Sequence, residues 1–293
     1  MVIQHNISAV NSYRNYTMNS SSLSKNLEKL SSGYRINRAA DDAAGLAISE
    51  QMRQKINGLD QATSNAKDAI GLIQTEEGAL TEVHSMLQRM TTLATQAANG
   101  TYNSVAKDSI QKEVSELSNE IDRIATATDY NGIKPLTADK NKKLEPMTMQ
   151  VGPTAGETLT VNKFDVHMSN IFKGADTKVK ANAQNNHLSI WAGKDKASNV
   201  SVANKAITAI TNAINKVSGY RADLGAKQNR IEHTINNLQT TSENITAAES
   251  RIRDTDMAKE IAAYTKNNVL SQAAQSMLAQ ANQQPQQVLQ LLG

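Results

Sequence analysis

The chain of 293 residues contains no cysteine and few aromatic residues: two phenylalanines, seven tyrosines and one tryptophan. The absence of cysteine excludes disulfides and thiolate metal sites. Aromatic rings usually supply much of the area buried in a compact core, so here burial must come from aliphatic residues and alanine. No run of about 18 apolar residues occurs, and a membrane-spanning helix is therefore not expected.

The chain also lacks a strong charge of either sign, since its formal net charge is only +3. The most basic stretch, Lys140–Lys143, is rich in turn-forming residues, which indicates a solvated loop rather than a nucleic-acid site. The first eight residues lack the charged and apolar regions of a Sec signal peptide. They favour a cytoplasmic protein or one exported by another route.

What the chain does have is a long helical repeat in its C-terminal half. From Ile207 to Ile252, apolar residues recur at steps of three and four, a pattern that we call the seam. A repeat of this length is typical of a coiled coil, here a rod of roughly 70–80 Å that needs a partner. The seam residues that we expect to be buried are Ile210, Ile214, Ile231, Ile235, Leu238 and Ile245.

The N-terminal half supplies that partner. Its own seam runs to a turn at Asn99–Thr101 and resumes as far as Tyr130. The predicted core positions are Ile56, Leu59, Ile70, Ile73, Leu117 and Ile121. The sequence therefore predicts a mainly α fold, in which both chain ends form a long antiparallel helical bundle or coiled coil.

The middle of the chain, residues 141–198, has a different pattern. Residues 147–151 and 159–161 alternate apolar and polar side chains around a loop at 152–156, which predicts a small β-hairpin. Residues 162–198 show no helical periodicity, and we expect a small, exposed, irregular cap there. The whole middle segment, including the hairpin, is expected to lie at the far end of the bundle. Trp191 is interpreted as part of a minor cluster under loops, with a binding anchor as the alternative.

Each terminal arm carries a single apolar stripe. Such helices are marginal alone, so we expect the arms to be disordered in the monomer, to pair, and to leave apolar surface exposed for self-association. Frayed termini without a function are the alternative. We expect Pro285 to end the C-terminal helix before a short apolar tail. The stripe and tail residues are Leu23, Leu27, Leu30, Tyr34, Ile261, Tyr264, Met277, Val288, Leu289, Leu291 and Leu292.

Four segments resemble the signatures of bacterial flagellin. LSSGYRINRAADDAAGLAIS at Leu30–Ser49 is similar to its N-terminal signature, and SMLAQANQQPQQVLQLL at Ser276–Leu292 to its C-terminal one. Asn119–Ile124 and Asp129–Ile133 match its core helix and the turn that follows. The resemblance divides the chain into inner-tube parts at 1–44 and 254–293, bundle parts at 45–140 and 199–253, and a variable insertion at 141–198.

This resemblance implies a structural subunit that polymerises into the extracellular flagellar filament and serves motility. The implied export route is the flagellar type III channel. The implied partners are further copies of the chain, an export chaperone, the filament cap and the hook–filament junction proteins. A hook–filament junction protein or a soluble helical adhesin remains the alternative. The chain has none of the phosphate-loop, nucleophile-elbow or zinc motifs that we sought, so no enzyme, catalytic residue, cofactor or metal is expected.

A second implied role is innate immune recognition. Gln88–Gln96 is similar to the flagellin segment read by the flagellin-sensing Toll-like receptor of animals, with Arg89, Leu93 and Glu113 matching its contacts. Arg89 and Leu93 are four residues apart, so one helix face can present both. We expect an exposed arginine beside an apolar anchor.

Overall fold

The computed structural model describes residues 6–137, 146–172, 188, 190 and 196–292, and it describes no side chains at 196–199 or 284–292. The predicted basic loop at Lys140–Lys143 and Trp191 lie outside the described residues. The chain forms two compact units. The terminal unit comprises residues 1–57 and 241–293, and the central unit comprises residues 58–240. The predicted fold class is confirmed, because both chain ends are helical around a small hairpin.

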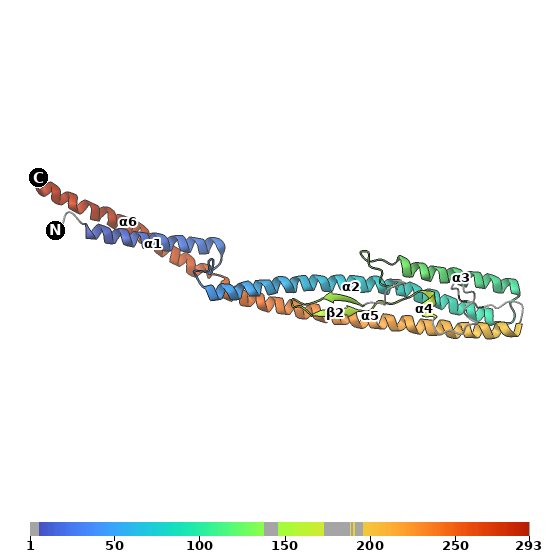
Figure 1. Ribbon diagram of the computed structural model, residues 1–293. Coiled ribbons are helices and arrows are strands. Elements are labelled where there is room, and N and C mark those ends of the chain that lie inside the picture. Colours follow the sequence, from blue (N-terminus) through green and yellow to red (C-terminus); the bar gives the residue numbers. More distant parts are fainter. Residues whose placement is uncertain (1–5, 138–145, 173–187, 189, 191–195, 293) are drawn as a thin grey trace. The chain divides into compact units, whose positions relative to one another are not determined.

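Three long helices supply the central unit: α3 (Ser104–Ala127), together with the parts of α2 (Ala43–Ala98) and α5 (Lys196–Arg253) that lie within residues 58–240. They lie side by side in Figure 1. The reversal between α2 and α3 falls at the predicted turn. There the Asn103 side chain accepts a hydrogen bond from the backbone N–H of Ala106 at 2.8 Å and so caps α3.

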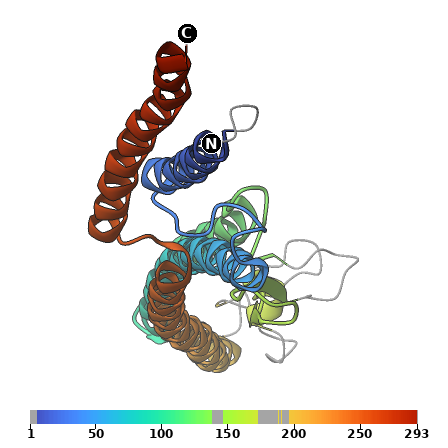
Figure 2. The ribbon, with the colours of Figure 1, turned by 90° about the vertical axis from the view of Figure 1, so that its left-hand side faces the viewer.

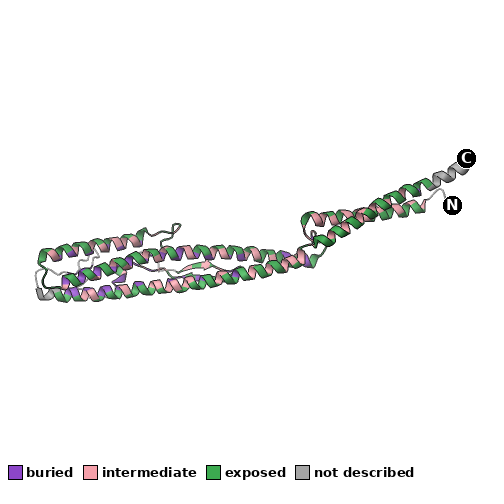
Figure 3. Ribbon diagram, turned by 180° about the vertical axis from the view of Figure 1, so that it is seen from behind, coloured by how far each residue is buried: buried purple, intermediate pink, exposed green. Residues whose placement is uncertain are grey.

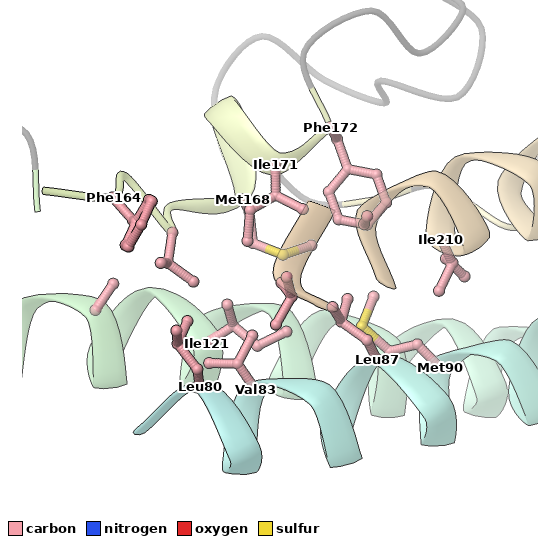
Figure 4. Close-up of a cluster of buried hydrophobic side chains, with 14 of the residues drawn as sticks. Leu80, Val83, Leu87, Met90, Ile121, Phe164, Met168, Ile171, Phe172 and Ile210 are labelled. Carbon is pink, nitrogen blue, oxygen red and sulfur yellow. The ribbon is translucent and has the colours of Figure 1, made fainter. Parts of the chain in front are cut away.

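The apolar repeat becomes the core of this unit, as Figure 4 shows for side chains from α2, α3 and α5. The predicted positions Leu59, Ile73, Ile121, Ile210, Ile231 and Leu238 are buried. Ile70, Leu117, Ile214 and Ile235 are half-buried and pack against the core. In the terminal unit, Ile56 and Ile245 are also half-buried.

The predicted hairpin is present, but its expected place was wrong. Strands β1 (Met147–Gln150) and β2 (Thr158–Val161) pair antiparallel, with Met147 opposite Val161. The side chain of Asn65 in α2 donates to the carbonyl of Gln150 at 3.1 Å. The hairpin therefore lies along α2 near residue 65 and not at the turn after Ala98. Leu159 and Val161 hold it there, because they add apolar area to the core.

The segment after the hairpin is not an exposed cap where the structure describes it. Phe164, Phe172 and the short helix α4 (Met168–Ile171) contribute to the core (Figure 4). The ring of Phe164 stacks on Tyr220 of α5, with centroids 4.4 Å apart. An irregular backbone can fill a core without helical periodicity, and the sequence pattern missed these residues for that reason.

In the terminal unit, α1 (Ile7–Ser32) pairs antiparallel with α6 (Met257–Leu292), as Figure 2 shows from the end of the molecule. Gly33 ends α1 in the left-handed region at φ +76°, where its N–H donates to the Lys29 carbonyl. No residue of α1 is buried, and Figure 3 shows both helices mostly exposed or half-buried. The expected end of the C-terminal helix at Pro285 was wrong, because α6 continues to Leu292.

Candidate functional site

The most unusual surface of the described chain is apolar and lies on α1 and α6. We call these exposed residues the apolar strip. On α1 they are Ile7, Val10, Tyr13, Met18 and Leu27, and on α6 they are Met257, Ile261, Val269, Leu270 and Met277. Each is 40–68% exposed. Single exposed apolar residues are common on protein surfaces, but ten of them on one pair of helices indicate an interaction surface.

A shallow groove of about 360 Å³ lies in this strip where α1 and α6 meet. Met18, Leu270 and Met277 supply its apolar side chains. Ala273 and Ala274 line the same groove and keep its wall low. Such a groove can accept an apolar side chain from another helix.

The predicted polymerisation residues divide between the pair's interior and its surface. Leu27, Ile261 and Met277 are exposed and belong to the strip. The remaining described ones are half-buried: Leu23, Leu30, Tyr34 and Tyr264. The side chains of Val288, Leu289, Leu291 and Leu292 lie outside the described residues. The two helices thus bury one part of each predicted stripe against each other and leave another part free.

The segment that follows α1 and the one that leads into α6 are tied together around Arg253. Its guanidinium lies 4.8 Å from the centre of the Tyr34 ring, and Nη1 is 2.7 Å from Oε1 of Glu50. This hydrogen bond is the main reason that the pKa of Glu50 is lowered. The backbone adds Thr255 N to Gly33 O at 3.0 Å and Arg35 N to Arg253 O at 2.7 Å.

Two of the three predicted receptor contacts, Arg89 and Glu113, form an exposed ion pair in the central unit. Arg89 of α2 donates to Oε1 of Glu113 in α3 from Nε at 2.8 Å and from Nη2 at 2.7 Å. Both side chains remain about half exposed, at 53% and 44%. Leu93 differs from the expectation, because it is only 1% exposed and belongs to the core. The expectation of an exposed apolar anchor at Leu93 was therefore wrong: helix α2 turns that side chain inward.

Within the part of the chain that the structure describes, no group of three or more acidic, histidine or cysteine side chains is arranged to hold a metal ion. The helices of that part are also too polar or too short to cross a bilayer.

Comparison with known proteins gives the family to which the chain belongs. A family model described as the bacterial flagellin N-terminal helical region matches residues 3–141, and the model of the C-terminal helical region matches residues 207–292. The chain belongs to the bacterial flagellin family. It is 50% identical to the flagellin of Bacillus subtilis (strain 168) over 305 residues, which cover 100% of both chains. It is 43% identical to the flagellar filament 33 kDa core protein of Treponema phagedenis over 295 residues, again covering 100% of each.

A solved structure shares the fold of this flagellin. The putative flagellar hook-associated protein from Vibrio parahaemolyticus superposes with a TM-score of 0.58 over 73% of this chain and 100% of its own, at 13% identity. At that identity the likeness concerns the fold alone. Family membership makes the chain a structural protein of the extracellular flagellar filament and not an enzyme.

Proposed function

We propose that this flagellin joins its filament by burying the apolar strip of α1 and α6 against neighbouring copies. The observation that carries the proposal is that α1 has no buried residue and that the described side chains of this helix pair include ten exposed large apolar residues. A helix pair that buries so little is marginal by itself and gains stability from further packing. Repeated contacts between unlike surfaces give an open helical polymer, as a filament requires.

The same surface fits the other proposed partners. An export chaperone would cover the strip and the C-terminal tail before secretion, because free apolar stripes aggregate. The filament cap and the hook–filament junction proteins would meet the strip at the two ends of the polymer. In this proposal the filament serves motility, and the polymerised state brings order to arms that are weakly folded in the monomer.

Replacing Val269 with Asp tests the strip directly. Val269 is 60% exposed, so the change should leave the monomer folded. In the filament the aspartate would lose the burial of a valine, about 1.5–3 kcal/mol, and would also place a charge in an apolar contact. We expect the critical concentration for seeded polymerisation to rise at least tenfold. Sedimentation of seeded samples measures it, with Val269→Leu as the control that keeps an apolar side chain. Equal critical concentrations for all three proteins would reject the strip as the interface.

A second proposed function is recognition of the shed monomer by the flagellin-sensing Toll-like receptor. The observation that favours it is the exposed Arg89–Glu113 pair, which presents a planar cation and a carboxylate on adjacent helices. Arginine is common among the residues that dominate binding energy at interfaces. In this proposal Leu93 supports the pair from beneath and does not contact the receptor.

We expect Arg89→Ala to weaken receptor binding about ten- to hundredfold, because a charge-assisted hydrogen bond across an interface contributes about 1.5–3 kcal/mol. The monomer should lose less than about 1 kcal/mol of stability, since the pair is exposed. Arg123→Ala is the matched control: Arg123 is also an exposed arginine, paired with Glu120 on α3. Surface plasmon resonance on the receptor ectodomain measures all three proteins. Equal affinity for wild type and Arg89→Ala would remove Arg89 from the contact.

A further inference from the structure

Helix α6 contains a proline that should interrupt it. The helix spans Met257–Leu292, and Pro285 lies well inside these limits. Proline has no amide hydrogen, so it cannot donate to the carbonyl four residues earlier. That carbonyl belongs to Ala281, which is only 7% exposed. A buried carbonyl without a donor is costly, and it requires a partner from elsewhere in the fold.

The partner comes from the other end of the chain. The side-chain amide nitrogen of Asn6 donates to the Ala281 carbonyl oxygen at 2.8 Å. The amide oxygen of the same side chain accepts from the backbone N–H of Ala9 at 3.0 Å, which caps the first turn of α1. One asparagine therefore satisfies a free donor at the start of α1 and a free acceptor in α6, across 275 residues of sequence.

The other asparagines that join these helices have different roles. Asn19 reaches the Leu270 carbonyl only at 3.5 Å, and residue 274 is an alanine, whose amide can still donate to that carbonyl. The neighbours of Asn26 fix the orientation of its side-chain amide. The amide nitrogen donates to the carboxylate of Glu260 at 3.1 Å, and the amide oxygen accepts from the side-chain nitrogen of Asn267 at 3.0 Å. Only Asn6, among these three, meets a carbonyl that lacks a helical donor.

We propose that Asn6 is a positioning residue that replaces the missing amide of Pro285. It lets α6 continue through the proline and fixes the start of α1 against α6 at one register. Asn6 is half-buried, and a polar asparagine placed where two helices meet can specify their register. The inference rests on the proposed function, because the polymer needs α1 and α6 aligned for the apolar strip to form one surface.

The test is a double-mutant cycle of Asn6→Asp and Pro285→Ala. Aspartate keeps the oxygen that caps α1 but cannot donate to the Ala281 carbonyl. Alanine in place of Pro285 restores the helical N–H, so the donor of Asn6 becomes redundant. We expect Asn6→Asp alone to raise the critical concentration for seeded polymerisation about tenfold, as the loss of one hydrogen bond to a buried carbonyl does. In the Pro285→Ala background, Asn6→Asp should raise the critical concentration less than about twofold.

Asn19→Asp is the control, because its target carbonyl retains a helical donor; we expect less than about a twofold change. Circular dichroism of the filaments should show equal helix content for Asn6→Asp and wild type once both are polymerised. The inference is overturned if Asn6→Asp has no effect, or if its effect is as large in the Pro285→Ala background as in the wild-type background. These outcomes are separate from the Val269 test: if Val269→Asp blocks assembly while the cycle shows no coupling, only the role of Asn6 fails.

Discussion

Replacing Ile231 with Asp is expected to unfold the central unit. Ile231 lies in α5, is 1% exposed and belongs to the core cluster. Its replacement removes about 2–3 kcal/mol of apolar burial. It also places a carboxylate where no water can solvate it, which costs several kcal/mol more or forces the group to stay protonated. The combined loss of about 5 kcal/mol or more equals the whole stability of many domains.

Three further variants test whether the loss of folding stability depends on how deeply the substituted side chain is buried. Ile231→Val should cost only about 0.5–1.5 kcal/mol, because one methylene is removed. Ile235→Asp should be milder than Ile231→Asp, since Ile235 is half-buried. Asn236→Asp adds the same charge at an exposed position and should change stability by less than about 0.5 kcal/mol. Urea unfolding followed by circular dichroism ranks the four proteins. A normal unfolding midpoint for Ile231→Asp would show that this side chain is not in the core.

The helices of this flagellin could be predicted because their apolar period is long and regular. Every predicted seam residue of the central unit is buried or packs against the core, from Leu59 in α2 to Leu238 in α5. A repeat that continues over many turns predicts a helix even where single positions of the seam are polar. Arg221 is such a position, and it pairs with Glu77 at 3.4 Å. Helix type and position therefore follow from local pattern.

What the sequence could not show depends on contacts between distant residues. The continuation of α6 through Pro285 requires a donor, and that donor is Asn6, at the other end of the chain. The burial of Phe164 requires Tyr220, which the irregular middle segment could not reveal. Leu93 was assigned to the surface from a motif, whereas the exact rotation of α2 turns it into the core. In each case a tertiary contact overrides a correct local rule.

Glu76 is a buried acidic residue of the central unit. It lies in α2 with its side chain fully buried, and neither carboxylate oxygen has a hydrogen-bond partner in the described part of the chain. Burial raises the pKa of Glu76 from 4.5 to about 7, although the charges of Lys227 and Lys163 act to lower it. Lys227 is itself 3.4 Å from Asp223, one turn away on α5, so its charge is shared.

The central unit should therefore lose stability as the pH rises from about 4.5 to 7. Over that window the folded protein retains a proton on Glu76, while the unfolded chain releases it from an ordinary carboxyl group. The penalty is complete above pH 7 and amounts to about 3 kcal/mol, because one pKa unit corresponds to about 1.4 kcal/mol. Exposed carboxylates with lowered pKa values, such as Glu120 beside Arg123, act in the opposite direction and over a lower pH range.

Glu76→Gln isolates this contribution, because glutamine resembles the protonated acid at every pH. At pH 8 we expect the variant to be about 2–3 kcal/mol more stable than wild type, with the difference disappearing near pH 4.5. Glu82→Gln is the matched control: Glu82 is an exposed carboxylate on the same helix, and its removal should change stability by less than about 0.5 kcal/mol at either pH. The measurement is urea unfolding of the three monomers between pH 4.5 and 8. If wild type and Glu76→Gln keep a constant difference across that range, the pKa of Glu76 is the same in the folded and the unfolded state, and burial in the helical core of this flagellin does not shift it.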